Sequence, residues 1–199
     1  MTEIPEFRGF PSIARLTRGI IVTEKLDGTN AQVRVLEDGR VIAGCRTRWI
    51  TPDADNYGFA QWVKDHEDEL RTGLGEGAHF GEWWGQGIQR RYGMAEKRFS
   101  LFNVGRWSES TLLPHSEKRE KPPQCCHVVP VLHAGNFDTA DIDGILYALQ
   151  RGGSIAAPGF MQPEGIVVYH SPSRTLFKKT LDKNDEHKSE SQQFEQEAA

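Results

Sequence analysis

The chain has 199 residues, of which 37% are hydrophobic and 26% are charged, so it contains enough apolar side chains to form the core of one globular domain. No apolar run approaches the roughly 18 residues of a membrane helix, and the N-terminal residues lack the basic and apolar regions of a signal peptide. Two of the three cysteines are adjacent, which makes a poor disulfide framework. We therefore expect a cytoplasmic protein without membrane contact and exclude a disulfide-stabilised scaffold.

The net charge of −4 does not exclude an anionic partner, because residues 182–199 alone carry six acidic and two basic side chains. Residues 1–181 are consequently neutral, whereas residues 182–199 have the polar, acidic composition of a disordered tail. We therefore predict a folded domain over residues 1–181. Within it, the stretch IQRRYGMAEKR at 88–98 is a candidate basic groove.

In chain order, the sequence predicts short strands that are joined by turns and interrupted by two helices. The Asp38-Gly39 turn joins the strands AQVRVL and VIAGC in a hairpin. The spacing of apolar residues predicts helices near 57–71 and over 139–150, the second with Thr139 as its N-cap. Further strands are expected at AHFGEWW (78–84), RFSLFNV (98–104), HVVPVL (127–132), GIVVYH (165–170) and TLFKKTL (175–181), with a surface loop at 106–124. The predicted class is α+β, with mainly antiparallel sheets and a few flanking helices.

Several charged residues lie in or beside these apolar strands. Lys25 ends a β-like run and precedes the turn DGTN, and Lys178 and Lys179 lie inside the strand TLFKKTL. Glu82 lies in GEWWG, and Glu164 precedes GIVVY. A lysine amine that is buried or flanked by cations can act as a nucleophile. Lysines and separated carboxylates can together bind a nucleoside triphosphate with its magnesium ion, although each residue alone is more often a solvated strand edge.

The order of these residues resembles the motifs of the covalent nucleotidyltransferases, which include ATP-dependent DNA ligases, RNA ligases and mRNA capping enzymes. EKLDGTN (24–30) is similar to motif I, K-x-D-G, of that superfamily. The other motifs follow in order as CRTR (45–48, motif Ia), FGEWWG (80–85, motif III), RFSLFNV (98–104, motif IIIa), PEGIVVY (163–169, motif IV) and LFKKT (176–180, motif V). The asparagine of motif I, the RT of motif Ia and the run FGEWWGQGIQ resemble RNA ligases of the T4 RNA ligase 2 type.

The resemblance implies that residues 1–181 form an ATP-grasp-like nucleotidyltransferase (adenylation) domain. It implies ATP and Mg²⁺ as cofactors, with Mn²⁺ as a substitute, and RNA or DNA with 5′-phosphate and 3′-hydroxyl ends as the partner. The implied reaction has three steps: formation of a lysyl-AMP, transfer of AMP to a 5′-phosphate, and displacement of AMP by a 3′-hydroxyl.

The resemblance also implies roles for individual residues. Lys25 would be the nucleophile, with Asp27 beside it, and Lys178 would contact the α-phosphate. The other implied nucleotide-binding residues are Glu24 in the adenine pocket, Asn30, Arg46, Glu82 on the ribose, Phe102 stacked on adenine, and Lys179; the implied metal-binding residues are Glu164 and Asn30. Phe99 competes with Phe102 for the stacking role, and Arg48 is an alternative to Arg46.

Two departures from the family pattern limit these expectations. The motif V lysines are adjacent, so Thr180 stands where a second lysine is common, and Lys179 would need an irregular backbone to join Lys178 on one face. The chain also ends without the C-terminal domain of many ligases, so a partner protein that clamps nucleic acid is expected. The alternatives are a small DNA ligase, a self-adenylating nucleotidyltransferase with another acceptor, and an inactive nucleic-acid-binding module.

Overall fold

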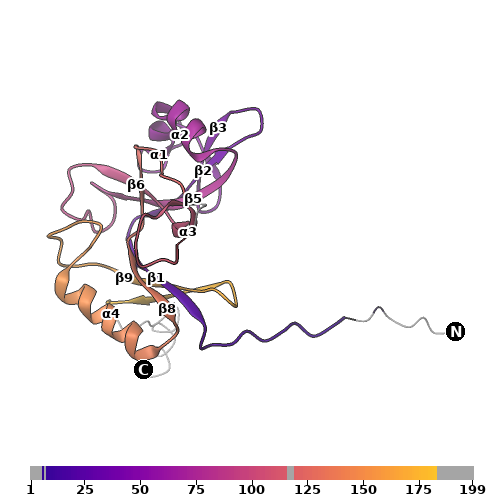
Figure 1. Cartoon of the computed structure of the whole chain (residues 1–199). Helices are drawn as coiled ribbons and strands as arrows, with labels where there is room; N and C mark the ends of the chain where they lie inside the picture. Colours follow the sequence, from indigo (N-terminus) through magenta and orange to yellow (C-terminus); the bar gives the residue numbers. More distant parts are fainter. Residues whose placement is uncertain (1–5, 7, 116–118, 183–199) are drawn as a thin grey trace, which may run out of the picture.

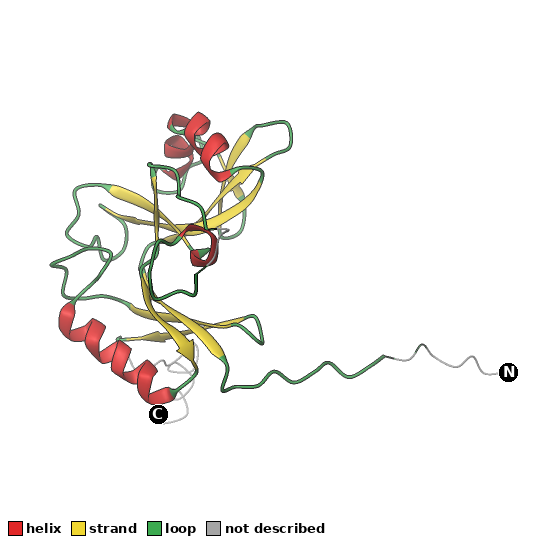
Figure 2. Ribbon diagram, in the orientation of Figure 1, coloured by secondary structure: helices red, strands yellow, loops and turns green. Residues whose placement is uncertain are grey.

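The structure is a computed structural model that describes residue 6 and residues 8–115 and 119–182. Two β-sheets lie between the longer helices, which occupy opposite ends of the molecule (Figures 1 and 2). One sheet has four strands in the order β10-β9-β1-β8, and the other has six in the order β4-β3-β2-β5-β6-β7. Only the β6–β7 pair is parallel among the described strands. The predicted α+β class with mainly antiparallel sheets is therefore confirmed.

The four-stranded sheet brings together the two ends of the domain. Its strands are β1 (Gly19–Lys25), β8 (Val131–Asn136), β9 (Gly165–His170) and β10 (Thr175–Thr180). Helix α4 (Thr139–Gly152) covers one face, where Ile142 and Leu149 pack in a cluster with Ile20, Val22 and Ile166. Alternate residues of β1 are buried because this face is covered.

The six-stranded sheet carries the larger core. Its strands are β2 (Thr29–Val35), β3 (Val41–Cys45), β4 (Trp49–Ile50), β5 (Gly77–Gly85), β6 (Lys97–Leu101) and β7 (Cys126–Val128). Helices α1 (Phe59–Asp65) and α2 (Glu67–Leu74) cover one face, and the fully buried Phe59 and Leu70 pack there against Val33 and Phe99. The opposite face of this sheet carries exposed residues.

The structure corrects the predicted boundaries at three places. The helix predicted at 57–71 is two helices that meet at His66. The strand predicted at 98–104 ends at Leu101. The short helix α3 (Val104–Trp107) follows it, with the Asn103 side chain as its N-cap. The run HVVPVL is divided between β7 and β8, in different sheets, with Pro130 between them, since proline cannot donate a ladder hydrogen bond.

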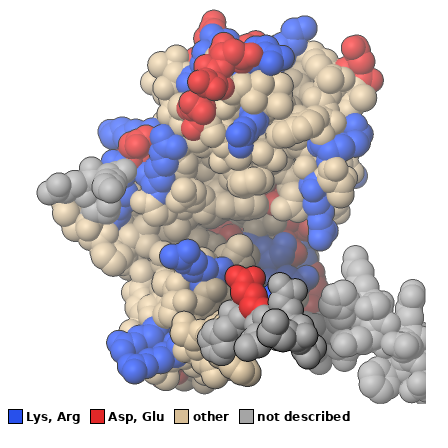
Figure 3. All heavy atoms as spheres, turned by 90° about the vertical axis from the view of Figure 1, so that its right-hand side faces the viewer, with Lys and Arg blue, Asp and Glu red and all other residues tan. Residues whose placement is uncertain are grey.

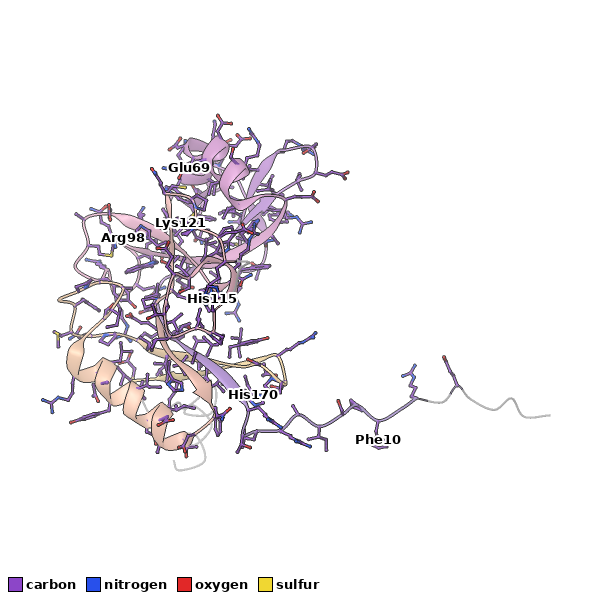
Figure 4. The ribbon with its side chains drawn as sticks, in the orientation of Figure 1. Phe10, Glu69, Arg98, His115, Lys121 and His170 are labelled. Carbon is purple, nitrogen blue, oxygen red and sulfur yellow. The ribbon has the colours of Figure 1, made fainter. Side chains whose placement is uncertain are left out.

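The remaining predictions on the fold concern the helix cap and the chain ends. The N-cap of α4 is Asp138 and not Thr139, because the Asp138 side chain accepts a hydrogen bond from the N–H of Ala140. Before β1 the chain extends away from the body, and Phe10 is fully exposed (Figure 4). Among the described residues, no helix has the length and apolar character that crossing a membrane requires. The acidic tail after Asp182 lies outside the described residues.

Candidate active site

The site is built around Lys25, the last residue of β1. Its Nζ forms an ion pair with Glu164 at 2.7 Å, and both side chains are mostly buried. Lys25 pairs in the β1–β9 ladder with Gly165, so Glu164 directly precedes the residue opposite the lysine. Gly165 has φ 152°, and a Cβ there would lie 2.3 Å from the carbonyl oxygen of Lys179. The first position of β9, between β1 and β10, therefore requires glycine.

Glu82 joins the site from the other sheet. Its Oε1 accepts a hydrogen bond of 3.0 Å from the N–H of Gly28, in the loop between β1 and β2. That loop lies directly on β5, since a Cβ at Gly28 would come within 2.4 Å of the Trp83 carbonyl oxygen. Burial raises the pKa of Glu82 to about 7, although the positive charge of Lys25 opposes the shift. Burial also raises the pKa of Glu164, against the hydrogen bond from Lys25.

Asp27 is held by two residues that the sequence motifs did not identify. Its carboxylate accepts a hydrogen bond of 3.0 Å from Arg90 Nε, and its backbone N–H donates to the Tyr92 hydroxyl at 2.8 Å. The other guanidinium nitrogens of Arg90 donate to the carbonyl oxygen of Gln162 at 3.1 Å and to Asp182. Arg90 therefore connects the segments that carry motifs I, III, IV and V.

Glu24 points away from Lys25, because successive strand residues face opposite sides of a sheet. Its buried carboxylate accepts hydrogen bonds from the Ser154 hydroxyl at 2.5 Å and from the N–H groups of Ile155 and Ala156, both at 2.9 Å. Burial raises the pKa of Glu24, and these hydrogen bonds oppose the rise. In the structure Glu24 therefore anchors the loop that follows α4.

The two lysines of motif V face opposite sides of the four-stranded sheet. Lys178 pairs with Val167, which pairs with Thr23, so Lys178 is on the face that also carries Lys25. Lys179 is on the other face, where its Nζ lies 2.5 Å from Asp143 of α4. The structure therefore brings Lys178 and Lys25 to one face and directs Lys179 to the helix.

Three further sequence candidates lie on or beside the six-stranded sheet. Asn30 is exposed and pairs with Glu82 in the β2–β5 ladder, and Arg46 is exposed in the turn directly after β3. Phe102 is 40% exposed after β6, whereas Phe99 is fully buried in the core. Between these two phenylalanines, only Phe102 is available to a ligand.

The candidate basic groove at 88–98 does not present a row of unpaired cations. Arg90 binds two carboxylates, Arg98 binds Glu96, and Lys97 donates a hydrogen bond to the Tyr57 carbonyl oxygen. The space-filling view instead shows a hollow between the two parts of the molecule, with Lys and Arg side chains at its rim and inside it (Figure 3).

The residues around Lys25 fit a nucleotide-bound magnesium ion and not a closed protein metal site. Among the described residues, no group of three or more His, Cys, Asp or Glu side chains could hold a metal ion by itself. Mg²⁺ in phosphate-transfer sites is usually held by one or two carboxylates together with substrate phosphates. Glu164 supplies one such carboxylate, with 16% of its side chain exposed.

The chain was compared with protein families and with solved structures. A model of the RNA ligase family matches residues 18–181. Similar solved structures include a Naegleria gruberi RNA ligase mutant with AMP and Mn (TM-score 0.56, 17% identity, covering 83% of this chain and 50% of that one). Another mutant, with ATP and Mn, has a TM-score of 0.56 and 18% identity, covering 84% of this chain and 51% of that one. The chain thus spans about half the length of these structures, which at this identity support the fold alone. No curated protein matches the sequence.

Proposed function

Because the chain belongs to the RNA ligase family, we propose that it is an ATP-dependent RNA ligase that acts through a lysyl-AMP intermediate on Lys25. The observation that carries the proposal is the ion pair between Lys25 and Glu164, with buried Glu82 across the loop from Lys25. This arrangement combines an amine nucleophile, a carboxylate for the metal and a carboxylate for the ribose in one place. The related Naegleria gruberi structures contain ATP or AMP with Mn, which supports the nucleotide and the divalent cation.

In the first step, the Lys25 nitrogen attacks the α-phosphorus of ATP. A nitrogen–phosphorus bond forms, the bond between the α-phosphorus and the oxygen bridging to the β-phosphate breaks, the proton of the amine is released to solvent, and pyrophosphate leaves. Mg²⁺, held by Glu164 and the phosphates, would neutralise charge on the leaving group. Lys178 shares a sheet face with Lys25 and would stabilise the charge on the phosphorus oxygens.

The following two steps consume the adenylate. An oxygen of the RNA 5′-phosphate attacks the AMP phosphorus and releases Lys25, and a 3′-hydroxyl then attacks the activated 5′-phosphate and expels AMP. Glu82 would hydrogen-bond the ribose, and the accessible Phe102 ring would stack on adenine. The motif pattern favours the T4 RNA ligase 2 type, in which RNA is the substrate.

The test is the intact mass of the protein after incubation with ATP and Mg²⁺, beside Lys25→Ala. We expect one added AMP on the wild-type protein and none on the variant. The adenylated protein is then given nicked or single-stranded RNA with a 5′-phosphate, or the equivalent DNA. Joined RNA supports the ligase, and joined DNA alone would indicate a DNA ligase. A folded wild-type protein that gains no nucleotide would refute the proposal, provided that it was not adenylated beforehand.

A further inference from the structure

Helices cover one face of the six-stranded sheet, whereas the opposite face, called the open face here, carries exposed residues on β2, β4 and the first half of β5. Along β2, Ala31 and Val33 are buried under α1 and α2, whereas Asn30 and Arg34 are exposed on the opposite side and Gln32 is half-buried there. Glu82 pairs with Asn30, so it lies on the same face, at the point where the loop between β1 and β2 covers that face. The candidate active site therefore occupies only one part of the open face, and the rest of that face extends beyond it.

Exposed aromatic rings form a row across the open face. Gln32 pairs with Phe80 on one side and with Gly44 on the other, and Gly44 pairs with Trp49. Directly paired residues project from the same face of a sheet. Adjacent strands are about 4.8 Å apart, so Trp49 and Phe80 are separated by three spacings, or about 14 Å. The row thus holds two ring positions on β4 and β5, with a polar amide between them.

These rings are accessible although they are large and apolar. Phe80 is 56% exposed and Trp49 is 53% exposed. The absence of a side chain at Gly44 makes room for the Trp49 ring, because a Cβ there would lie 3.0 Å from it. At the other end of the row, the N–H of Phe102 donates to the carbonyl oxygen of Phe80 at 2.9 Å. The row therefore leads directly to the ring that is expected to stack on adenine.

Two exposed arginines lie near the rings of Phe80 and Trp49. Arg34 is exposed on the open face, two residues from Gln32 along β2, and Arg46 is exposed directly after β3. Within the part of the chain that the structure describes, no carboxylate forms an ion pair with either arginine. The guanidinium groups are thus available to an anionic ligand that lies across the sheet.

We propose that this open face is a platform for the unpaired bases of an RNA strand, with bases stacked on Phe80 and Trp49 and a backbone phosphate bound by Arg34. The inference deepens the proposed function and rests on it, because the strand would run from the platform to its reacting end at Lys25. Stacking on aromatic side chains needs the flat face of a base, and inside a duplex the neighbouring base pairs cover these faces. Arg34, exposed beside these rings, supplies the positive charge that the phosphate backbone of a nucleic acid requires.

The test is the binding of a fluorescein-labelled oligouridylate, measured by anisotropy without ATP. We expect Phe80→Ala and Trp49→Ala each to weaken binding about 5- to 150-fold, the range found when one stacking side chain is removed. Phe80→Trp and Trp49→Phe retain a ring and should bind within about threefold of wild type. Tyr147→Ala is the matched control, since Tyr147 is an equally exposed aromatic residue on α4, away from this face, and should leave binding unchanged.

Two further readouts separate stacking from a general loss of structure. Trp49 is the most exposed tryptophan, so quenching of intrinsic fluorescence by the oligouridylate should be strong in the wild type and largely lost in Trp49→Phe. Arg34→Ala should reduce the salt dependence of binding by about one counterion, as expected for one phosphate contact. The urea midpoint of each variant verifies that it is folded.

The outcomes distinguish the platform from the ligase itself. If Phe80→Ala and Trp49→Ala bind the oligouridylate as the wild type does, or if the wild type binds a blunt duplex more tightly, the platform is overturned. A change of oligomeric state in these variants without a change in RNA binding would also overturn it, in favour of a protein interface. The mass of the Lys25 adduct is independent of these measurements, so a failure of adenylation refutes the ligase and leaves the binding result to decide on the platform.

Discussion

Lys25 and Glu164 are 139 residues apart in the sequence, yet their side chains meet at 2.7 Å between β1 and β9. The pair holds the amine and the carboxylate in place at the point where, under the proposed function, ATP and its metal ion enter. In the proposed reaction this ion pair must open: the Glu164 carboxylate then binds the metal ion, and the Lys25 amine approaches the α-phosphorus.

Replacing Glu164 with glutamine should raise the Mg²⁺ concentration needed for adenylation of Lys25. The amide keeps the size of the side chain but removes the negative charge that the ion pair and the metal share. We expect at least about a tenfold shift in the Mg²⁺ dependence, measured by intact mass over a magnesium titration. Asp143→Asn is the control, because Asp143 pairs with Lys179 on the other face of the sheet. An unchanged magnesium dependence in Glu164→Gln would remove Glu164 from the metal site.

The two motif V lysines should differ in their effect on adenylation. Lys178 shares a face with Lys25, so Lys178→Ala should slow lysyl-AMP formation by about 10²- to 10³-fold, the cost of removing one donor to a developing negative charge. Lys179 pairs with Asp143, partly exposed to solvent, so Lys179→Ala should mainly remove a weak surface interaction. Single-turnover rates with ATP would compare the two variants. Equal losses would contradict this difference between the two lysines.

Rapid adenylation of Lys25 should require the guanidinium group of Arg90, which a lysine side chain cannot replace. Its three guanidinium nitrogens reach Asp27, the Gln162 carbonyl oxygen and Asp182, and a single ammonium group cannot span these acceptors. We expect Arg90→Lys to slow adenylation roughly 10- to 100-fold, since small displacements of positioned groups have effects of this size. Arg91→Lys, on the exposed neighbouring arginine, is the matched control.

Hydrogen exchange would show whether Arg90 acts by positioning Asp27. The N–H of Asp27 donates to the Tyr92 hydroxyl, and both contacts come from the same loop. Exchange in peptides that contain Asp27 should therefore become faster in Arg90→Lys and remain unchanged in Arg91→Lys. A slow variant with normal exchange at Asp27 would contradict the positioning role.

The candidate residues that the sequence singled out most clearly are those whose setting is local. Lys25 at the end of a strand, Glu82 between glycine and tryptophans, and Glu164 before a β-branched run could each be recognised from neighbouring residues and motif order. The strands that carry them were predicted because apolar and β-branched residues dominate those segments. What joined these residues in one site is the pairing of distant strands, which no local pattern encodes.

The residues that were missed depend on long-range contacts. The sequence interpretation placed Arg90 in a candidate basic groove, because charge composition does not reveal that Asp27 and Asp182 lie opposite it. No sequence pattern indicated a role for Tyr92, because its hydroxyl binds a backbone N–H that is 65 residues away in the sequence. The alternation rule did separate Lys178 from Lys179, because strand geometry is local.

Glu82 should make the stability of the protein depend on pH. Burial raises its pKa from 4.5 to about 7 in the folded state, so below pH 4.5 the carboxyl group is protonated in both the folded and the unfolded protein. As the pH rises toward 7, the unfolded chain releases this proton first, and the free energy of unfolding falls by up to about 3 kcal/mol. Glu82→Gln lacks this effect, so its stability relative to the wild type should increase between pH 5 and pH 8. Urea unfolding at both pH values measures the difference, and a difference that does not change with pH would show that Glu82 ionises normally in the folded protein.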